Sequence, residues 1–204
     1  MAVLAKNRAR LVLAPGAPDI YFNDPITSGL RRHRGILFPY QPDITYSASV
    51  AYAPYDLTHT NYTFQAYRNT PSPDIQLTCQ FASVTDEEAR YTYAVIHFLR
   101  SVSKMWFGAN EGASGVAPGT PPPVLLFSAF GQQQFSNIPV VVTQFSTTYD
   151  SNVDLKLIDG NLQIPAMMNM FIGIAVQQNP DRQKNVYSTT DFISGRLYGE
   201  QGFI

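Results

Sequence analysis

The sequence predicts a mainly β domain of the α+β kind, in which two packed antiparallel sheets form a β-sandwich or barrel with one flanking α-helix. Two patterns carry this prediction. Apolar and polar residues alternate with a period of two in several segments, which is typical of half-buried strands. One segment instead has a helical period and begins with a capping box, Thr85-Asp86-Glu87-Glu88.

The N-terminal third of the chain divides into an irregular segment and three strands. Residues 1–34 are rich in Pro and Gly and are expected to form an extended arm with short pieces of strand, and residues 35–204 are expected to form the β domain. Alternation predicts strands over residues 44–52, 62–67 and 75–81, interrupted by Pro and Asp residues. In the third strand, Ile75, Leu77, Cys79 and Phe81 would share one face.

One strong helix is predicted over about residues 86–106, with Gly108 as its left-handed stop. Asp86 and Arg90 have the spacing of a supporting ion pair. A single apolar stripe follows the spacing of one helix face. Its members are Tyr91, Val95, Phe98, Val102 and Met105.

The C-terminal half predicts a long loop followed by strands. Residues 109–123 carry three glycines and three consecutive prolines, and a loop of this length is usually functional or mobile. Strands are predicted over residues 124–130, 138–149 and 163–177, with a turn around Asp159-Gly160. There is no internal repeat and no second domain in this pattern.

The composition favours a surface that partners cover. Of the 204 residues, 45% are hydrophobic and only 14% are charged, with 12 Tyr and 13 Phe. Ordinary soluble domains carry about 25% charged residues, and interface cores are depleted in charge and enriched in aromatic residues. The alternative is a stable monomeric β domain with a polar Ser, Thr and Gln surface.

Charge is distributed unevenly along the chain. Residues 1–34 contain six basic and two acidic residues, a net charge of +4, whereas the remainder contains eight basic and thirteen acidic residues, a net charge of −5. The segment Arg31-Arg32-His33-Arg34 is either a solvated loop or a docking surface for an acidic neighbouring subunit. No nucleic-acid-binding module accompanies it, so specific nucleic-acid binding is not predicted.

No constellation of residues predicts catalysis, a metal ion or a cofactor. Cys79 is the single cysteine, and His33, His59 and His97 match no metal-binding spacing. His97 lies mid-helix and is interpreted as a hydrogen-bonded structural residue. The longest apolar run, residues 164–176, is shorter than the roughly 20 residues that span a bilayer. We therefore expect a protein that is not an enzyme and does not enter a membrane.

Several segments, in order, resemble one known family. They are residues 57–62 (LTHTNY), 65–71 (QAYRNTP), 94–100 (AVIHFLR), 104–108 (KMWFG), 119–124 (GTPPPV), 138–143 (IPVVVT), 152–154 (NVD) and 202–204 (GFI). In these segments the chain resembles the tail-tube-type baseplate proteins of contractile-tailed bacteriophages, which cap the baseplate hub and initiate the tail tube. The resemblance covers roughly residues 30–204.

The resemblance implies a structural virion protein of the tail, assembled in the host bacterial cytoplasm. Six copies would close into a ring with a β-barrel lumen, between baseplate hub proteins below and tail-tube rings above. DNA would pass through it as cargo without specific binding, and the family brings no catalytic residues or cofactors. If the acidic residues line the bore, they would repel DNA phosphates; we state this as a hypothesis, which a bore lined by Arg and Lys would exclude.

Contacts between subunits or rings are expected in the turn of residues 55–62, in the 109–123 loop and in the basic segment of residues 31–34. The alternative for the two loops is that they are ordinary surface loops. Competing functions are a β-rich module that binds glycans through Tyr-rich loops, and a tube component of a related contractile injection system. The candidate contact residues are Tyr55, His59, Tyr62, Tyr67, Glu111, Ser114, Arg31, Arg32 and Arg34.

Overall fold

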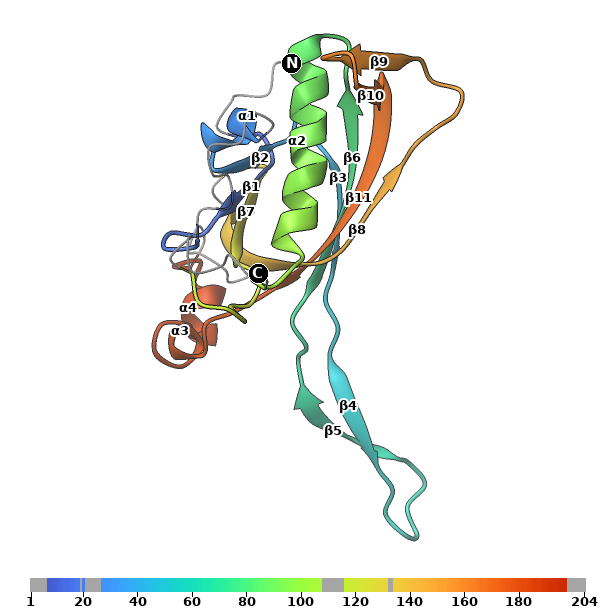
Figure 1. Ribbon diagram of the computed structural model, residues 1–204. Helices are drawn as coiled ribbons and strands as arrows, with labels where there is room; N and C mark the ends of the chain where they lie inside the picture. The colour runs from blue at the N-terminus through green and yellow to red at the C-terminus, as the bar shows by residue number, and fades with distance from the viewer. Residues whose placement is uncertain (1–6, 19, 21–26, 108–115, 132–133, 198–204) are drawn as a thin grey trace.

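The computed structural model describes residues 7–18, 20, 27–107, 116–131 and 134–197 (Figure 1). The described chain is mainly β, as the sequence predicts. A seven-stranded antiparallel sheet has the order β2-β1-β7-β8-β11-β6-β3, and two small sheets pair β4 with β5 and β9 with β10. The described strands do not close into a barrel.

The elements are as follows. The strands are β1 (Arg10–Leu13), β2 (Gly35–Leu37), β3 (Asp43–Ser47), β4 (Ala51–Tyr55), β5 (Phe64–Asn69), β6 (Asp74–Ala82), β7 (Leu125–Ala129), β8 (Phe135–Thr148), β9 (Leu155–Ile158), β10 (Leu162–Pro165) and β11 (Met167–Val176). The helices are α1 (Ser28–Arg31), α2 (Asp86–Val102), α3 (Pro180–Asn185) and α4 (Thr189–Ile193).

The two parts of β8 pair with different neighbouring strands of the large sheet. The first part of β8 pairs with β7, where Ile138 lies opposite Phe127, and the second part pairs with β11, where Phe145 lies opposite Ile172. The register shifts between Gly173 and Ile174, which is typical of a β-bulge and of a bent strand. In Figure 1, β2, β1 and β7 lie to one side of α2, and β11, β6 and β8 lie to the other.

One apolar core lies between the sheet and α2. Alternate residues of β6 and β11 are fully buried, as are Leu11 of β1, Phe127 of β7 and Phe98 of α2. Burial of this apolar surface is the main stabilising term of the fold. The predicted inward face of β6 is confirmed, since Ile75, Leu77, Cys79 and Phe81 are at most 1% exposed.

Part of the predicted N-terminal arm belongs to this core. Strand β1 lies inside the large sheet between β2 and β7, and Leu11 and Leu30 are fully buried. Residues 10–13 and 28–31 of the segment therefore pack with residues 35–204 and do not extend away from them.

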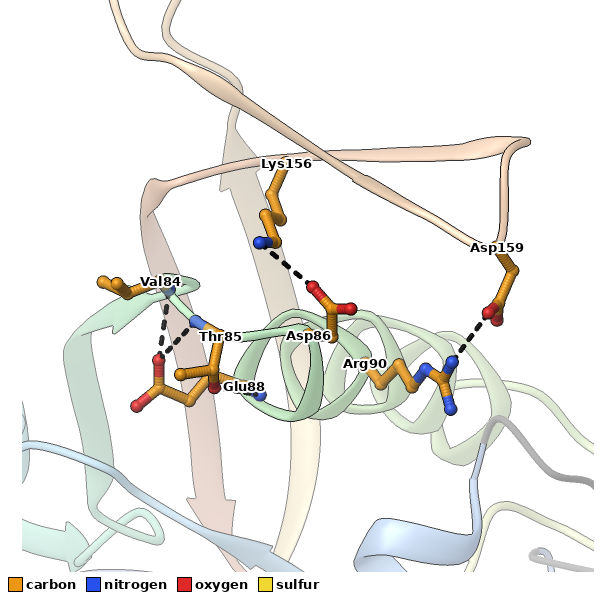
Figure 2. Close-up of polar contacts among 7 residues, drawn as sticks. All are labelled: Val84, Thr85, Asp86, Glu88, Arg90, Lys156 and Asp159. Atoms are coloured by element: carbon orange, nitrogen blue, oxygen red, sulfur yellow. Dashed lines mark hydrogen bonds and ion pairs between the residues drawn. The ribbon is translucent and has the colours of Figure 1, made fainter.

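The predicted start of α2 is confirmed. The Glu88 amide donates to Thr85 Oγ1 at 3.2 Å, and Glu88 Oε2 accepts from the amides of Thr85 at 3.0 Å and Val84 at 3.1 Å (Figure 2). These bonds satisfy amides that a helix N-terminus leaves without intrahelical partners. The Thr85 amide, foremost among these donors, lowers the pKa of Glu88.

The predicted end of α2 near Trp106 is wrong. The helix ends at Val102, with Ser103 as its C-cap. Beyond it, the Trp106 amide donates to the Thr120 carbonyl at 2.9 Å and the Trp106 carbonyl accepts from the Gly119 amide at 2.8 Å. These contacts with a distant loop replace helical hydrogen bonds. Met105, the last residue of the predicted stripe, is accordingly 53% exposed, and Gly108 lies outside the described residues.

The side chains of Asp86 and Arg90 do not form the predicted pair. Asp86 lies 3.0 Å from Lys156 Nζ and Arg90 lies 2.6 Å from Asp159 Oδ1, so both residues reach the β9–β10 hairpin (Figure 2). Asp159 and Gly160 have φ values of 50° and 76°, as a tight hairpin turn with two positive φ values requires. The two ion pairs attach this hairpin to the first turns of α2.

Two predicted strands are divided in the structure. The alternation over residues 44–52 falls on β3, which pairs with β6, and on the start of β4, which pairs with β5. The predicted strand over residues 163–177 divides into β10 and β11 at Ala166, whose amide donates to the Asp154 carbonyl at 2.7 Å. The short helices α1, α3 and α4 were not predicted.

Candidate assembly surfaces

The β4–β5 hairpin projects away from the body of the molecule (Figure 1). Among the described strands, β4 and β5 pair only with each other. Tyr52 and Tyr67 are opposite one another, with ring centroids 6.1 Å apart and planes at 77°. All six residues of β5 are exposed. A two-stranded hairpin is marginally stable alone in water, so this one is suited to docking on another surface.

The connection between β4 and β5 is held by local hydrogen bonds. Thr63 Oγ1 donates to Asp56 Oδ1 at 2.7 Å, and Thr60 Oγ1 donates to the Leu57 carbonyl at 2.9 Å. His59 has a φ of 63°, a left-handed conformation that residues other than Gly adopt infrequently. The backbone at the tip of the hairpin is thus shaped by its own residues.

Four of the predicted contact residues, Tyr55, His59, Tyr62 and Tyr67, lie on this hairpin and are exposed. Large apolar and aromatic side chains continue along it, a concentration that marks an interaction surface more often than a free one. These side chains are Tyr52 (55% exposed), Tyr55 (60%), Leu57 (44%), Tyr62 (82%), Phe64 (55%) and Tyr67 (62%).

The basic cluster, Arg31 to Arg34, forms the end of α1 and the turn after it. Arg31, Arg32, His33 and Arg34 are all exposed. The turn is fixed to the sheet, because the Leu13 amide donates to the Arg34 carbonyl at 2.9 Å. Leu30 anchors the helix in the core. The cluster is therefore a surface of defined shape and not a loose loop.

A cleft of about 610 Å³ lies between α1, the first turns of α2 and the segment after β2. Tyr91 Oη donates to the Leu37 carbonyl and accepts from the Leu37 amide, both at 2.8 Å, and burial raises the pKa of Tyr91 to about 12. Arg8 donates to the carbonyls of Phe38 and Pro39, each at 2.8 Å. Basic and acidic residues both line the cleft: Arg8, Arg32, His33, Arg90, Glu87 and Glu88.

A third surface, which the sequence did not predict as a site, is the solvent side of the strands β3, β6, β11 and the second part of β8. The registers of these strands place Gln76 beside Thr45 and Gly173, and Thr78 beside Asp43 and Phe171. Met167, two residues before Asn169 on β11, is exposed on this side. We call the exposed polar residues on this side the polar face. They are Asp43, Thr45, Ser47, Asp74, Gln76, Thr78, Gln80, Gln144, Ser146, Thr148 and Asn169. It contains two carboxylates and no Lys or Arg.

These four strands have an unpaired edge on each side. In the part of the chain that the structure describes, β3 pairs only with β6, and β8 beyond Val140 pairs only with β11. An unpaired edge presents backbone donors and acceptors that can extend the sheet into another chain.

The end of the molecule opposite the β4–β5 hairpin also exposes apolar side chains. There, β9 and β10 lie beside the first turn of α2 (Figure 1). We call these residues the end cluster: Val84 (71% exposed), Leu155 (58%), Leu157 (52%) and Met167 (53%). The alternation in residues 155–158 could have predicted that Leu155 and Leu157 share one side of a strand. Only the contact of β9 with α2 shows that this side is the exposed one.

Two predicted contact residues, Glu111 and Ser114, lie outside the described residues. The surfaces that carry the other seven candidates are separate: the hairpin bears Tyr55, His59, Tyr62 and Tyr67, and the α1 region bears Arg31, Arg32 and Arg34. In Figure 1 the hairpin and α1 point in different directions from the body.

The chemistry of the described residues is limited. No group of three or more His, Cys, Asp or Glu among them could hold a metal ion. Burial, and secondarily the charge of Asp43, raises the pKa of Cys79 to about 12, so its thiol stays protonated at neutral pH. His97 is half-buried on α2, and its Nδ1 has no hydrogen-bond partner in the described chain, unlike the prediction. No helix within the described ranges has the length and hydropathy to cross a bilayer.

No protein-family model matches this chain, and no curated protein matches its sequence.

Proposed function

We propose that this protein is a structural component of a contractile phage tail, which forms a ring of the tail tube or baseplate and lets DNA pass. The observation that carries the proposal is the polar face: a four-stranded sheet surface with uncharged polar side chains, two carboxylates and an unpaired edge on each side. The family resemblance in the sequence supplies the expected number of six copies.

The unpaired edges support closure into a ring. The outer edge of β3 in one copy can pair with the second part of β8 in the next, which is a head-to-tail contact. Contacts of this kind close into rings when the rotation between copies is right. Closure would remove both exposed edges, which a lone molecule leaves available for aggregation.

The chemistry of the polar face supports its position at the bore. Asp43 and Asp74 are its only charged residues. Protein surfaces that bind DNA hold phosphates with Lys and Arg, and this face has neither. A lumen of uncharged side chains with a few carboxylates would allow DNA to pass without retaining it.

The two ends of the molecule support stacking along the axis of the ring. The exposed aromatic residues of the β4–β5 hairpin lie at one end and the end cluster lies at the other. Two different apolar surfaces at opposite ends suit contacts with different neighbours, a baseplate hub protein below and a tube ring above.

Native mass spectrometry and negative-stain imaging of the purified protein over a range of concentrations test the proposal. We expect closed rings of one size, with six copies. Only monomers at every concentration would contradict the proposal.

The exposed tyrosines of the hairpin favour a second candidate, a module that binds glycans. Tyr52 and Tyr67 present aromatic rings to solvent on adjacent strands, and aromatic rings offer apolar faces to ligands. A glycan array distinguishes the two candidates: specific glycan binding by a monomer supports the second, and rings without glycan binding support the first.

A further inference from the structure

We propose that the basic cluster of one copy contacts an acidic loop, residues 149–154, of the neighbouring copy. This inference depends on the proposed ring, and it names the side-chain contact that sets the order of copies around it. In the ring, the basic cluster of one copy would meet the acidic loop of the next copy once per interface, beside the paired sheet edges.

The acidic loop connects β8 to β9. Tyr149, Asp150 and Asp154 are exposed. Asp150 Oδ1 accepts from the Asn152 amide at 3.0 Å, and the Asp154 carbonyl accepts from the Ala166 amide at 2.7 Å. The first bond shapes the loop internally, the second ties its end to the segment between β10 and β11, and both Asp residues are exposed. The nearest cation along the chain, Lys156, lies 3.0 Å from Asp86 instead.

The basic cluster is similarly held. Its turn is attached to β1 through the bond between the Leu13 amide and the Arg34 carbonyl. Arg32 and His33 line the cleft between α1 and α2. Two acidic residues, Glu87 and Glu88, also line this cleft. Glu88 Oε2 accepts from two amides at the start of α2. Arg90, a basic residue of the cleft, is paired with Asp159. Glu87 is the acidic residue there that no such contact occupies.

The two surfaces lie on opposite sides of the molecule. In Figure 1, α1 lies at the left of α2, and the connection between β8 and β9 lies at the far right, at a similar height. The acidic loop directly follows the second part of β8, which pairs with β11 on one side and leaves its other edge unpaired among the described strands. A head-to-tail ring that joins the β8 side of one copy to the opposite side of the next therefore brings unlike charges together.

Complementary charges at the rim of an interface set orientation and association rate more than affinity. A single exposed pair contributes little, but reversing one partner places like charges at every interface of the ring. We therefore expect Arg32→Glu or Asp154→Arg to raise the protein concentration needed for half-assembly at least about tenfold, an effect that weakens in high salt.

Mixing the two variants is the decisive experiment. Each variant alone places one like-charged pair at every interface, either Glu at position 32 against Asp154 or Arg32 against Arg at position 154. In an alternating ring, Glu at position 32 meets Arg at position 154 in one interface, and Arg32 meets Asp154 in the next. We expect an equimolar mixture of R32E and D154R to form rings at the wild-type concentration, and the double variant to do so alone. Native mass spectrometry counts the copies of each variant in a ring.

The matched control is Lys184→Glu, which reverses an exposed charge on α3, away from both surfaces. Thermal unfolding of every variant verifies that the monomer is folded. Rings of R32E and D154R that assemble like the wild type would overturn the inference and leave the proposed function intact. If the wild type forms no ring, the proposed function fails first, and the inference fails with it.

Discussion

Strand β6 and the β4–β5 hairpin have similar alternating sequences and opposite environments. Ile75, Leu77 and Phe81 of β6 are fully buried against α2 and the neighbouring strands, whereas Phe64 and Tyr67 of β5 are more than half exposed. Alternation fixes which residues share a face of a strand. It does not determine whether that face is covered by the same chain or by another one.

Because of this difference, we assign folding of the monomer to the body and association with other chains to the hairpin. The body of the molecule has a continuous apolar core, while the hairpin is made of local pairs such as Tyr52 with Tyr67 and Thr63 with Asp56. Substitutions in the body should therefore change the stability of the monomer. Substitutions on the hairpin should change association and leave the monomer unaltered.

The largest effect is expected from Phe81→Ala. The Phe81 ring is fully buried, 6.3 Å from the ring of Phe38, so its removal leaves a cavity. We expect the free energy of unfolding to fall by about 3–5 kcal/mol in a denaturant titration. The matched control is Phe64→Ala on the hairpin, expected to change it by less than about 0.5 kcal/mol. Equal losses for the two variants would contradict the division between body and hairpin.

A smaller effect is expected from pH, and again only in the body. Glu88 has a lowered pKa because the amides at the start of α2 donate to its carboxylate. A depressed folded-state pKa stabilises the protein above the unfolded value near 4.5, and this contribution is lost as pH falls through the folded value.

Thermal unfolding of the wild type and Glu88→Gln from pH 7 to pH 3 tests this. The variant should be less stable at pH 7, and the two curves should converge in acid. A constant difference across the pH range would argue against the capping carboxylate as its source.

The smallest effect on stability is expected from Tyr62→Ser, because this side chain is 82% exposed at the tip of the hairpin. The unfolding temperature should be unchanged within error. Stacking of rings should nevertheless weaken, since an interface loses an aromatic contact. Sedimentation velocity measures the proportion of stacked rings, and Thr148→Ser on the polar face is the control for a change remote from the hairpin.

Local chemistry explains what the sequence could predict of the fold. The strand over residues 75–81 could be predicted from alternation. The start of α2 could be predicted from a four-residue capping box. The end of α2 depends on Trp106 meeting Gly119 and Thr120, and the division of residues 44–52 depends on β3 pairing with β6 while β4 pairs with β5. Contacts between distant segments are not visible in a local pattern.

The same distinction holds for the candidate surfaces. The sequence could predict contact residues at Tyr55, Tyr62 and Tyr67 because these aromatic residues lie in or near a predicted turn. The polar face required the order β8-β11-β6-β3, since Gln76, Gln144 and Asn169 come from strands far apart in the chain. The role proposed for Arg32 likewise required knowing that α1 and the 149–154 loop lie on opposite sides of the body.

A cryo-EM map of the assembled protein would show which surface lines the bore. We expect a closed ring in which β3 of each copy adjoins the second part of β8 of the next, and in which Gln76, Thr78 and Gln144 line the bore. A ring whose bore is lined by Arg and Lys, or one in which the polar face points outward, would contradict it.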